Sequence, residues 1–252
     1  MGEAPRVFAN SAAVYDLLYS GKDTVAEATW ISQKLKKYGC ESPANLLEFG
    51  SGTGRHARVF GDMGFHVTGV EPSAEMLERA EAHPKVSYLQ GDTATTRTAP
   101  SFDAVLALFH VASYHTTLQD LHSFFDTANF HLKNGGLFGF DVWYSPAVHS
   151  LLPEERTLKV SNSELSVTRV ARPSEDILNS LVTVHYDYAV TDIASGSISR
   201  FAEQHEMRHF TQTEVQLLAS LHGFELLESA EFMTDGQPAR KTWSVWFTLR
   251  KR

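Results

Sequence analysis

Strand-like and helix-like segments alternate five times between residues 45 and 142 of this chain. The strand-like segments are short apolar runs, and the first, Asn45–Phe49, has no charged residue before Glu48. Such runs are typical of parallel strands, because the helices that connect parallel strands bury both faces of the sheet. The alternation therefore predicts an α/β fold with a Rossmann-like, doubly wound and mostly parallel sheet. The strands are expected at residues 45–49, 65–70, 86–89, 102–108 and 137–142, and the helices at 56–63, 73–82 and 117–132.

The sequence on either side of this core follows other patterns. Residues 11–39 carry apolar side chains at helical spacing before and after Gly21, which predicts two helices within residues 1–40. Polar and apolar side chains alternate through residues 156–210, and this period of two predicts an antiparallel β insertion over residues 146–210. The α/β core then comprises residues 41–145 and 211–252.

Two local signals place element ends within that core. Gly135 and Gly136 are expected to end the helix before the fifth strand. Thr211 and Glu214 have the spacing of a capping box and open a last helix. Two strands over residues 224–233 and 242–249 follow it, and we expect the last one to pair antiparallel at the end of the sheet.

Charge and cysteine content argue against several classes of protein. The chain has 22 basic and 30 acidic residues, a formal net charge of −8. Such a surface repels polyanions, so no nucleic-acid partner is expected. Cys40 is the only cysteine, and no apolar run is long enough to cross a membrane. We therefore expect a cytoplasmic protein without a membrane partner.

A glycine-rich turn, Gly50-Ser51-Gly52-Thr53-Gly54, follows the first strand. A nucleotide cofactor needs the backbone to approach it closely here, and glycine permits that approach. The spacing of Gly52, Gly54 and Ala57 also fits the pattern of NAD-dependent dehydrogenases. Glycine spacing alone therefore does not exclude an NAD enzyme.

Three acidic residues at strand ends favour a different cofactor. Glu48 lies inside the end of the first strand, where a carboxylate is costly unless it meets a cation, such as the ammonium of a methionine moiety. Glu71 ends the second strand and can accept hydrogen bonds from both ribose hydroxyls, as it would in an NAD enzyme. Asp92 follows the third strand, where it can accept a hydrogen bond from an adenine amino group.

Three segments resemble the successive motifs of class I S-adenosylmethionine-dependent methyltransferases: Glu48–Gly54, Val70–Ser73 with Met76, and Gly91-Asp92. The last helix and the two final strands resemble the ending of that family. The resemblance implies an enzyme that transfers the methyl group of S-adenosylmethionine to a small molecule. The cofactor-binding residues that it implies are Tyr19, Glu48, Gly50, Ser51, Gly52, His56, Glu71, Pro72, Met76, Asp92, Thr93, Leu108 and His110.

Further motifs resemble the sugar N-methyltransferases, which methylate the amine of nucleotide-linked aminodeoxyhexoses. They are Tyr15-Asp16-Leu17-Leu18, Gly21-Lys22-Asp23, Glu27-Ala28, Gly54-Arg55-His56, Trp143, Glu203-x-His205 and Phe210-Thr211. The loop His110–His115 and the segment Tyr144–Ala147 depart from that family's pattern, and both flank the expected substrate pocket. The resemblance implies a nucleotide-linked aminosugar as acceptor, and the departures leave O-methylation of a sugar or another small hydroxy compound as an alternative.

The resemblance also implies that residues 1–40 form a helical lid over the cofactor. Tyr15 and Tyr19 lie one helical turn apart on it, and packing in the core is the other interpretation of both. His115 and His205 are the candidates for positioning or deprotonating the acceptor. Tyr15 completes the candidate catalytic set, and the expected substrate-binding residues are Tyr114, Trp143, Tyr144 and Glu203.

Other chemistries have weaker support. The sequence has no H-E-x-x-H spacing that would predict a metal site and no G-x-S-x-G elbow of a serine hydrolase. A regulator that binds the cofactor without catalysis is the second alternative. A diphosphate on the acceptor would need cations, and Arg172, Arg200 and Arg208 are available. The β insertion is expected to serve substrate binding or formation of a homodimer.

Overall fold

The structure is a computed structural model that describes residues 11–99, 102–151 and 153–252. Its core strands are β1 (Asn45–Phe49), β2 (His66–Glu71), β3 (Val86–Gln90), β4 (Phe102–Ala107), β5 (Leu132–Tyr144), β10 (Phe224–Glu231) and β11 (Ser244–Lys251). Its core helices are α2 (Thr24–Lys37), α3 (Arg55–Asp62), α4 (Ala74–Leu77), α5 (Leu118–His131) and α7 (Gln212–Leu221), with a short 3₁₀ turn, η1 (Val111–Tyr114).

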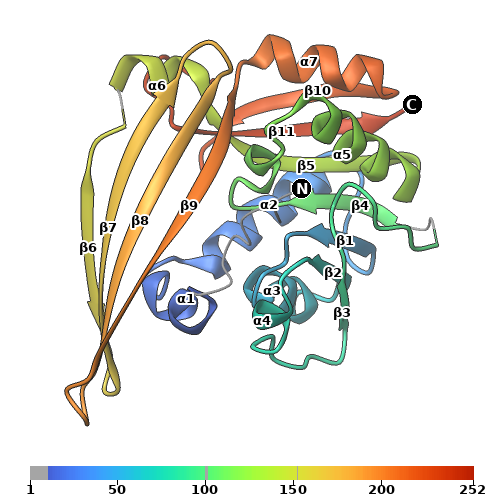
Figure 1. Ribbon diagram of the computed structural model, residues 1–252. Helices are drawn as coiled ribbons and strands as arrows, with labels where there is room; N and C mark the ends of the chain where they lie inside the picture. Colours follow the sequence, from blue (N-terminus) through green and yellow to red (C-terminus); the bar gives the residue numbers. More distant parts are fainter. Residues whose placement is uncertain (1–10, 100–101, 152) are drawn as a thin grey trace.

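The core sheet has the strand order β3-β2-β1-β4-β5-β11-β10 (Figure 1). The first five strands are parallel, and β11 runs antiparallel between β5 and β10. The predicted Rossmann-like fold is thereby confirmed, and β1 has the predicted bounds. The capping box at Thr211 and Glu214 is also present.

Three predicted details of the core are wrong. α4 ends at Leu77 instead of residue 82, because the chain turns back early and His83 pairs with Val86 at the start of β3. β11 lies inside the sheet and β10 takes the edge, in keeping with the deeper burial of β11.

The third detail is the glycine pair before the fifth strand. α5 ends at His131 and β5 begins at the next residue, so that Gly135 and Gly136 lie within the strand. A Cβ atom on Gly136 would come within 2.9 Å of the Lys133 carbonyl oxygen. Close backbone packing, and not the end of a helix, is therefore what requires glycine at this position.

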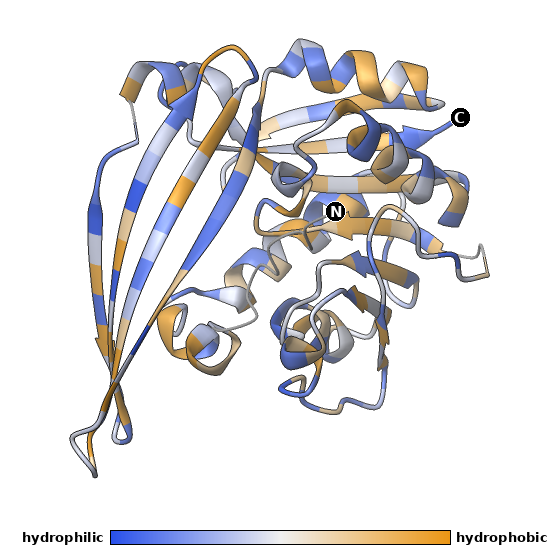
Figure 2. Cartoon of the chain, viewed as in Figure 1, coloured by the Kyte–Doolittle hydropathy of each residue, from blue (hydrophilic) through white to orange (hydrophobic). Residues whose placement is uncertain are grey.

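The β insertion is a curved antiparallel sheet that follows a short helix. The helix is α6 (Ser145–Leu151), and the strands are β6 (Arg156–Ser161), β7 (Leu165–Asp176), β8 (Leu181–Asp192) and β9 (Ile198–Phe210). Figure 2 shows hydrophilic and hydrophobic residues alternating along β7 and β8, the pattern that predicted these strands. β9 joins the core sheet through two residue pairs only, Trp143 with His209 and Tyr144 with Phe210.

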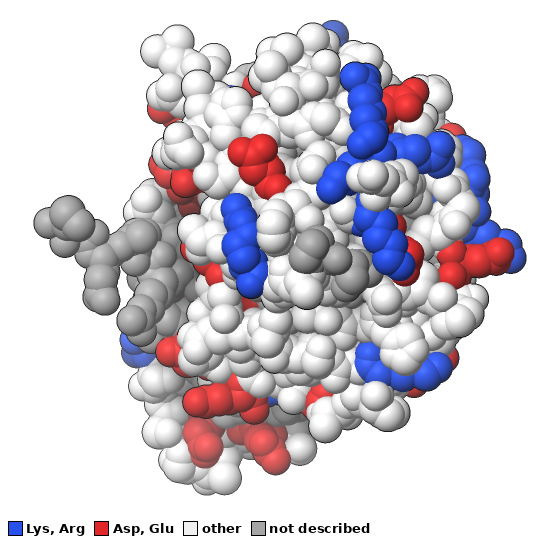
Figure 3. All heavy atoms as spheres, turned by 90° about the vertical axis from the view of Figure 1, so that its right-hand side faces the viewer, with Lys and Arg blue, Asp and Glu red and all other residues white. Residues whose placement is uncertain are grey.

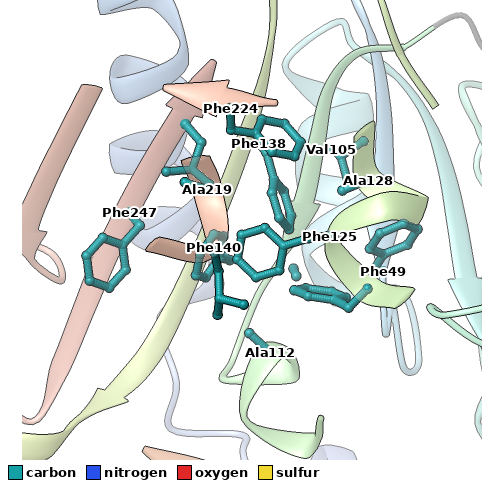
Figure 4. Close-up of a cluster of buried hydrophobic side chains, with 14 of the residues drawn as sticks. Phe49, Val105, Ala112, Phe125, Ala128, Phe138, Phe140, Ala219, Phe224 and Phe247 are labelled. Carbon is teal, nitrogen blue, oxygen red and sulfur yellow. The ribbon is translucent and has the colours of Figure 1, made fainter. Parts of the chain in front are cut away.

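The main core lies between the sheet and the helices α5 and α7. Buried phenylalanines from β1, α5, β5, β10 and β11 meet there, with α5 and β5 supplying the central rings (Figure 4). The Phe138 and Phe140 rings, on alternate positions of β5, lie 4.8 Å apart between centroids. Burial of such large rings is a main source of fold stability.

A separate apolar cluster attaches the N-terminal helix α1 (Ala12–Leu18) to the insertion. Val14 and Leu18 of α1 are buried against Val167 of β7 and Tyr188 of β8. In Figure 1, α1 accordingly lies beside the lower half of the curved sheet. The helix therefore spans the gap between the insertion and the glycine-rich turn of the core.

The surface is unevenly charged. On the face that Figure 3 shows, Lys and Arg side chains gather in the upper right part, and several Asp and Glu side chains lie at the lower edge. Among the residues with described coordinates, no helix is long and apolar enough to cross a membrane.

Candidate active site

A pocket opens at the carboxyl ends of the core strands, the edge at which open α/β sheets hold ligands. Eight of the predicted site residues line it: Tyr15, Tyr19, Glu48, Gly50, Ser51, Gly52, His56 and Leu108. Five residues outside the predicted site set complete its wall: Lys22, Thr24, Thr53, Arg55 and Phe109. The predicted lid helix and the predicted glycine turn therefore face one pocket.

Backbone conformation, close neighbours and access for a ligand each favour glycine in this turn. Gly50, Gly52 and Gly54 all have positive φ angles, of 63°, 56° and 76°. A Cβ atom on Gly50 would lie 2.5 Å from Val111, and one on Gly54 would lie 2.0 Å from the Tyr88 hydroxyl. A Cβ atom on Gly52 would meet no atom within 4 Å. Gly52 thus leaves open space beside the pocket, where a ligand can approach the backbone.

Glu48 is a buried carboxylate, and one of its two oxygens has no hydrogen-bond partner among the described residues. Its side chain is 2% exposed, and no hydrogen-bond partner for Oε2 exists in the described part of the chain. Burial, together with the charge of Glu71, raises the pKa of Glu48 to about 8, although a backbone hydrogen bond from Ala57 opposes this shift. A cation in the pocket would offset the free-energy cost of burying the charge of Glu48.

Glu71 is fixed at the end of β2 by two backbone hydrogen bonds. Gly52 N donates to its Oε2 and Ser73 N donates to its Oε1, each at 2.9 Å. Burial raises the pKa of this carboxyl, and the two backbone donors oppose the shift. The side chain therefore links the glycine turn to the turn after β2, and its contact with a ribose stays a prediction.

The end of α1 is held against the glycine turn by polar contacts. Thr53 Oγ1 donates to Asp16 Oδ1 at 2.8 Å, and Arg55 Nη1 donates to the Tyr19 carbonyl oxygen at 2.8 Å. The Tyr19 ring packs 4.8 Å from the Tyr15 ring and 5.0 Å from the Phe109 ring, between centroids. These contacts place both tyrosines in the wall of the pocket, and their action as a lid stays a prediction.

His56 belongs to a charged cluster at the same pocket. Its Nε2 lies 2.9 Å from Glu27 Oε2, and Glu27 also pairs with Lys22. The Lys22 ammonium lies 4.4 Å above the centre of the Phe109 ring. The motifs that include Lys22 and Glu27 gave these residues no predicted site role, because only the packing of α2 on α3 brings them to His56.

A hydrogen-bonded relay joins η1 to β9. The Tyr114 hydroxyl lies 2.9 Å from His205 Nδ1, and His205 Nε2 lies 3.4 Å from Glu203 Oε2. Ser11 donates to both Glu203 oxygens, from its backbone N at 2.9 Å and from its hydroxyl at 2.7 Å. Three predicted residues, two predicted for substrate and one for catalysis, thus form a single relay that also contacts the N-terminal segment.

His115 occupies a different environment from His205. Its ring stacks on Phe124 at 4.3 Å, and its Nε2 lies 3.0 Å from Thr93 Oγ1. Burial lowers the pKa of His115 to about 4, so the ring is neutral at neutral pH. Its contacts are those of a packing residue, so His205 is the stronger of the two catalytic candidates.

The remaining predicted residues lie around the pocket. Asp92 is exposed and accepts hydrogen bonds within its own turn, from Ala94 N and Thr95. The backbone N of His110 donates to Asp141, and its ring lies between Phe109 and Trp143. Trp143 and Tyr144 each pack against an apolar cluster. Met76 is buried beside the turn after β2, whereas Pro72 in that turn is exposed. Their ligand contacts stay predictions.

Arg169 on β7 is a cation that the sequence analysis missed. Its Nη1 donates to the Tyr19 hydroxyl at 3.0 Å, and its guanidinium lies 4.9 Å above the Tyr186 ring. In the described part of the chain it has no carboxylate partner, and its buried Nε has no hydrogen-bond acceptor. A partly buried cation in that state is suited to bind an anion.

The three arginines named from the sequence are engaged elsewhere or exposed. Arg172 pairs with Glu155 and Asp187, and Arg208 donates to the carbonyl oxygens of Thr116 and Asn179. Arg200 is exposed on β9. Only the pleat of β7, which places Arg169 on the face toward α1, could have distinguished Arg169 from them.

Comparison with known proteins agrees with this geometry. Residues 46–136 match the family described as a methyltransferase domain. YqeM of Bacillus subtilis (strain 168), named as a methyltransferase, is 26% identical over 250 residues, which cover 97% of each chain. The dTDP-3-amino-3,4,6-trideoxy-alpha-D-glucopyranose N,N-dimethyltransferase of Streptomyces venezuelae is 27% identical over 233 residues, which cover 91% of this chain and 94% of the relative.

Solved structures show the same fold. Streptomyces venezuelae DesVI superposes with a TM-score of 0.80 at 24% identity, covering 97% of this chain and 99% of that one. An S-adenosylmethionine-dependent methyltransferase from Clostridium acetobutylicum ATCC 824 gives a TM-score of 0.79 at 20% identity, covering 97% and 98%. The match includes the β insertion, because nearly the whole chain is covered.

Proposed function

The chain is a methyltransferase, and we propose that it transfers the methyl group of S-adenosylmethionine to the amine of a nucleotide-linked aminosugar. The observation that carries this proposal is the buried Glu48 carboxylate, whose Oε2 has no hydrogen-bond partner among the described residues, beside the open space at Gly52. That pair fits a ligand with both an ammonium group and a nucleoside. The dimethyltransferase activity named for the Streptomyces venezuelae relative supports the aminosugar.

The pocket residues fit the cofactor in distinct ways. Glu48 would hold the ammonium of the methionine moiety, and Glu71, at the end of β2, would accept hydrogen bonds from the ribose. Ser51, His56, Leu108, Pro72, Met76, Asp92, Thr93 and His110 complete the proposed cofactor site. When bound, S-adenosylmethionine supplies a methyl group already activated by its sulfonium, so the protein mainly aligns the acceptor and excludes water.

The acceptor would approach the pocket from the side that faces the insertion. Tyr15 and Tyr19 close the pocket on that side, and burial raises the pKa of Tyr15, so this hydroxyl stays protonated. An amine attacks only in its neutral form, and the ammonium of a free sugar must first lose a proton. Tyr114 and Glu203 occupy the two ring nitrogens of His205, so the amine would give its proton to the Tyr114 oxygen while the Tyr114 hydroxyl passes its own proton to His205 Nδ1.

Arg169 is the residue that supports a nucleotide-linked acceptor. A sugar nucleotide carries a diphosphate, and an uncompensated guanidinium next to Tyr19 is suited to bind it. The insertion would thus bind the acceptor while the core binds the donor. Transfer to a hydroxyl is the alternative, and a homodimer and a cytoplasmic location complete the proposal.

The test is a product assay on paired amino and hydroxy nucleotide sugars. We expect methyl transfer to the amine, with a rate that rises between about pH 7 and pH 9 as the amine loses its proton. His205→Asn should lower that rate about ten- to a hundredfold, since alignment survives in part, whereas loss of a general base for an alcohol costs about 10²–10⁴. Transfer to the hydroxy sugar alone would promote the O-methyltransferase alternative.

Binding of the demethylated cofactor should release a proton from Glu48. The carboxyl has a pKa of about 8 in the free chain and must be ionised to pair with an ammonium. The affinity for S-adenosylhomocysteine should therefore rise with pH, by up to about tenfold per unit, and level off near pH 8. Calorimetry in buffers of different ionisation enthalpy measures the released proton.

Two comparisons isolate the role of Glu48 in that experiment. Methylthioadenosine, which lacks the ammonium group, should bind with little pH dependence. Glu48→Gln should remove the pH dependence for S-adenosylhomocysteine as well. The same slope in the Glu48→Gln variant would show that another group, and not Glu48, pairs with the ammonium.

A further inference from the structure

Two histidines and a glutamate meet where the insertion joins the core, away from the pocket. His149 comes from α6, Glu175 from β7 and His209 from β9. One potential ligand atom from each lies within 4.8 Å of the others. His149 Nδ1 lies 2.9 Å from Glu175 Oε1, and the two imidazole rings are perpendicular with centroids 4.9 Å apart.

The solvent exposure of the three side chains increases from His209 to Glu175 to His149. His209 is fully buried, Glu175 is partly exposed, and the His149 side chain is 43% exposed. The buried His209 Nε2 has no hydrogen-bond partner in the residues that the structure describes. Its Nδ1 lies 2.8 Å from Ser145 Oγ, which fixes the orientation of the ring.

We propose that His149, Glu175 and His209 bind a divalent transition-metal ion of the zinc type. Two imidazoles and one carboxylate are a donor set that zinc uses when a fourth position is left to water. The exposed side of His149 gives that water access. Ser145 would act as the outer hydrogen bond that metal-bound histidines commonly have.

The simpler interpretation is an ion pair between His149 and Glu175 with His209 nearby. That interpretation leaves a buried ring nitrogen of His209 without a partner, which is costly. A metal ion satisfies this nitrogen and pairs with the carboxylate at the same time. The small movements needed to shorten the ligand distances fall on α6, whose end is exposed at Leu151.

A metal ion at this site would stabilise the fold and would take no part in methyl transfer. His209 pairs with Trp143 in the two-residue junction between β9 and β5, and α6 begins directly after β5 (Figure 1). An ion bound by α6, β7 and β9 would therefore tie the insertion to the core at its attachment point. This inference does not depend on the identity of the acceptor.

Zinc titration of the tag-free, chelator-treated chain tests the proposal. We expect one zinc ion per chain by calorimetry and, at a hundredfold excess over Kd, a thermal midpoint about 5–10 °C higher. His149→Asn should weaken binding at least tenfold while the free chain keeps its thermal midpoint, because this side chain is exposed. Cobalt substitution should give the intense visible absorption of a four-coordinate site.

The control is His122→Asn, at the other close histidine pair of the described chain. His122 Nδ1 lies 2.8 Å from His222 Nε2, and His222 in turn contacts Asp126. The control variant should bind zinc like the wild type. Binding that is lost in His122→Asn and kept in His149→Asn would overturn the proposal, and so would millimolar affinity in the wild type.

Discussion

Replacement of Gly52 by valine is expected to weaken the binding of S-adenosylhomocysteine by about 100-fold or more, which corresponds to about 3 kcal/mol. A Cβ atom at this position would enter the open space beside the pocket, where no protein atom lies within 4 Å. The new side chain would therefore displace the ligand and not a neighbour. Calorimetry of the folded variant measures the loss.

Backbone strain must be separated from this steric effect. Gly52 has a φ of 56°, a region that valine adopts at a cost of about 1–3 kcal/mol. Gly135 in β5 also has a positive φ, of 78°, and open space around its Cβ position, yet it lies outside the pocket. Gly135→Val should lose comparable stability and keep its affinity. Equal affinity losses in the two variants would contradict the proposed cofactor position.

Replacement of Arg169 by methionine is expected to raise the KM for a nucleotide-linked acceptor by about 100-fold, since a partly buried pair with a diphosphate is lost. The kcat should change little, because the guanidinium lies at Tyr19 and Tyr186 and not at Glu48. Methionine retains much of the apolar length of the side chain, so the packing against both rings is largely kept. Steady-state kinetics measures the change.

Two comparisons make the Arg169 result specific. Arg172→Met, three residues along the same strand, removes an exposed cation that pairs with Glu155 and Asp187, and should leave KM unchanged. A free aminosugar without the diphosphate should show the same KM in Arg169→Met as in the wild type. An unchanged KM for the nucleotide-linked sugar would place the diphosphate elsewhere.

The core and half of the pocket could be predicted because their signals are local in the sequence. β1 and the glycine turn after it are contiguous, and Glu48 is two residues from Gly50. The same local reasoning failed at the glycine pair before the fifth strand, where a Cβ atom on Gly136 would lie 3.2 Å from the Asp103 carbonyl oxygen of the neighbouring strand β4. A contact between strands leaves no mark in the spacing of neighbouring residues.

The acceptor side and the metal cluster could not be predicted for that reason. Arg169 faces Tyr19 across 150 residues of sequence, and His149, Glu175 and His209 come from three separate elements. His115 and His205 looked equivalent in the sequence. Their difference, a ring stacked on Phe124 against a ring in a hydrogen-bonded relay, is produced by tertiary packing alone.

The narrow junction between β9 and β5 has a consequence for how such a protein can diverge. In the described chain, two residue pairs join the curved sheet to the core strands at β5, while Glu48 and the glycine turn lie on and after β1, two strands beyond β5. A substitution of a β7 or β8 side chain that does not contact α1 can therefore reshape the insertion without passing strain along the sheet to the glycine turn. The residues proposed to bind the methyl donor and those proposed to bind the acceptor therefore lie in different parts of the chain. During evolution, the acceptor can change while the methyl donor stays the same.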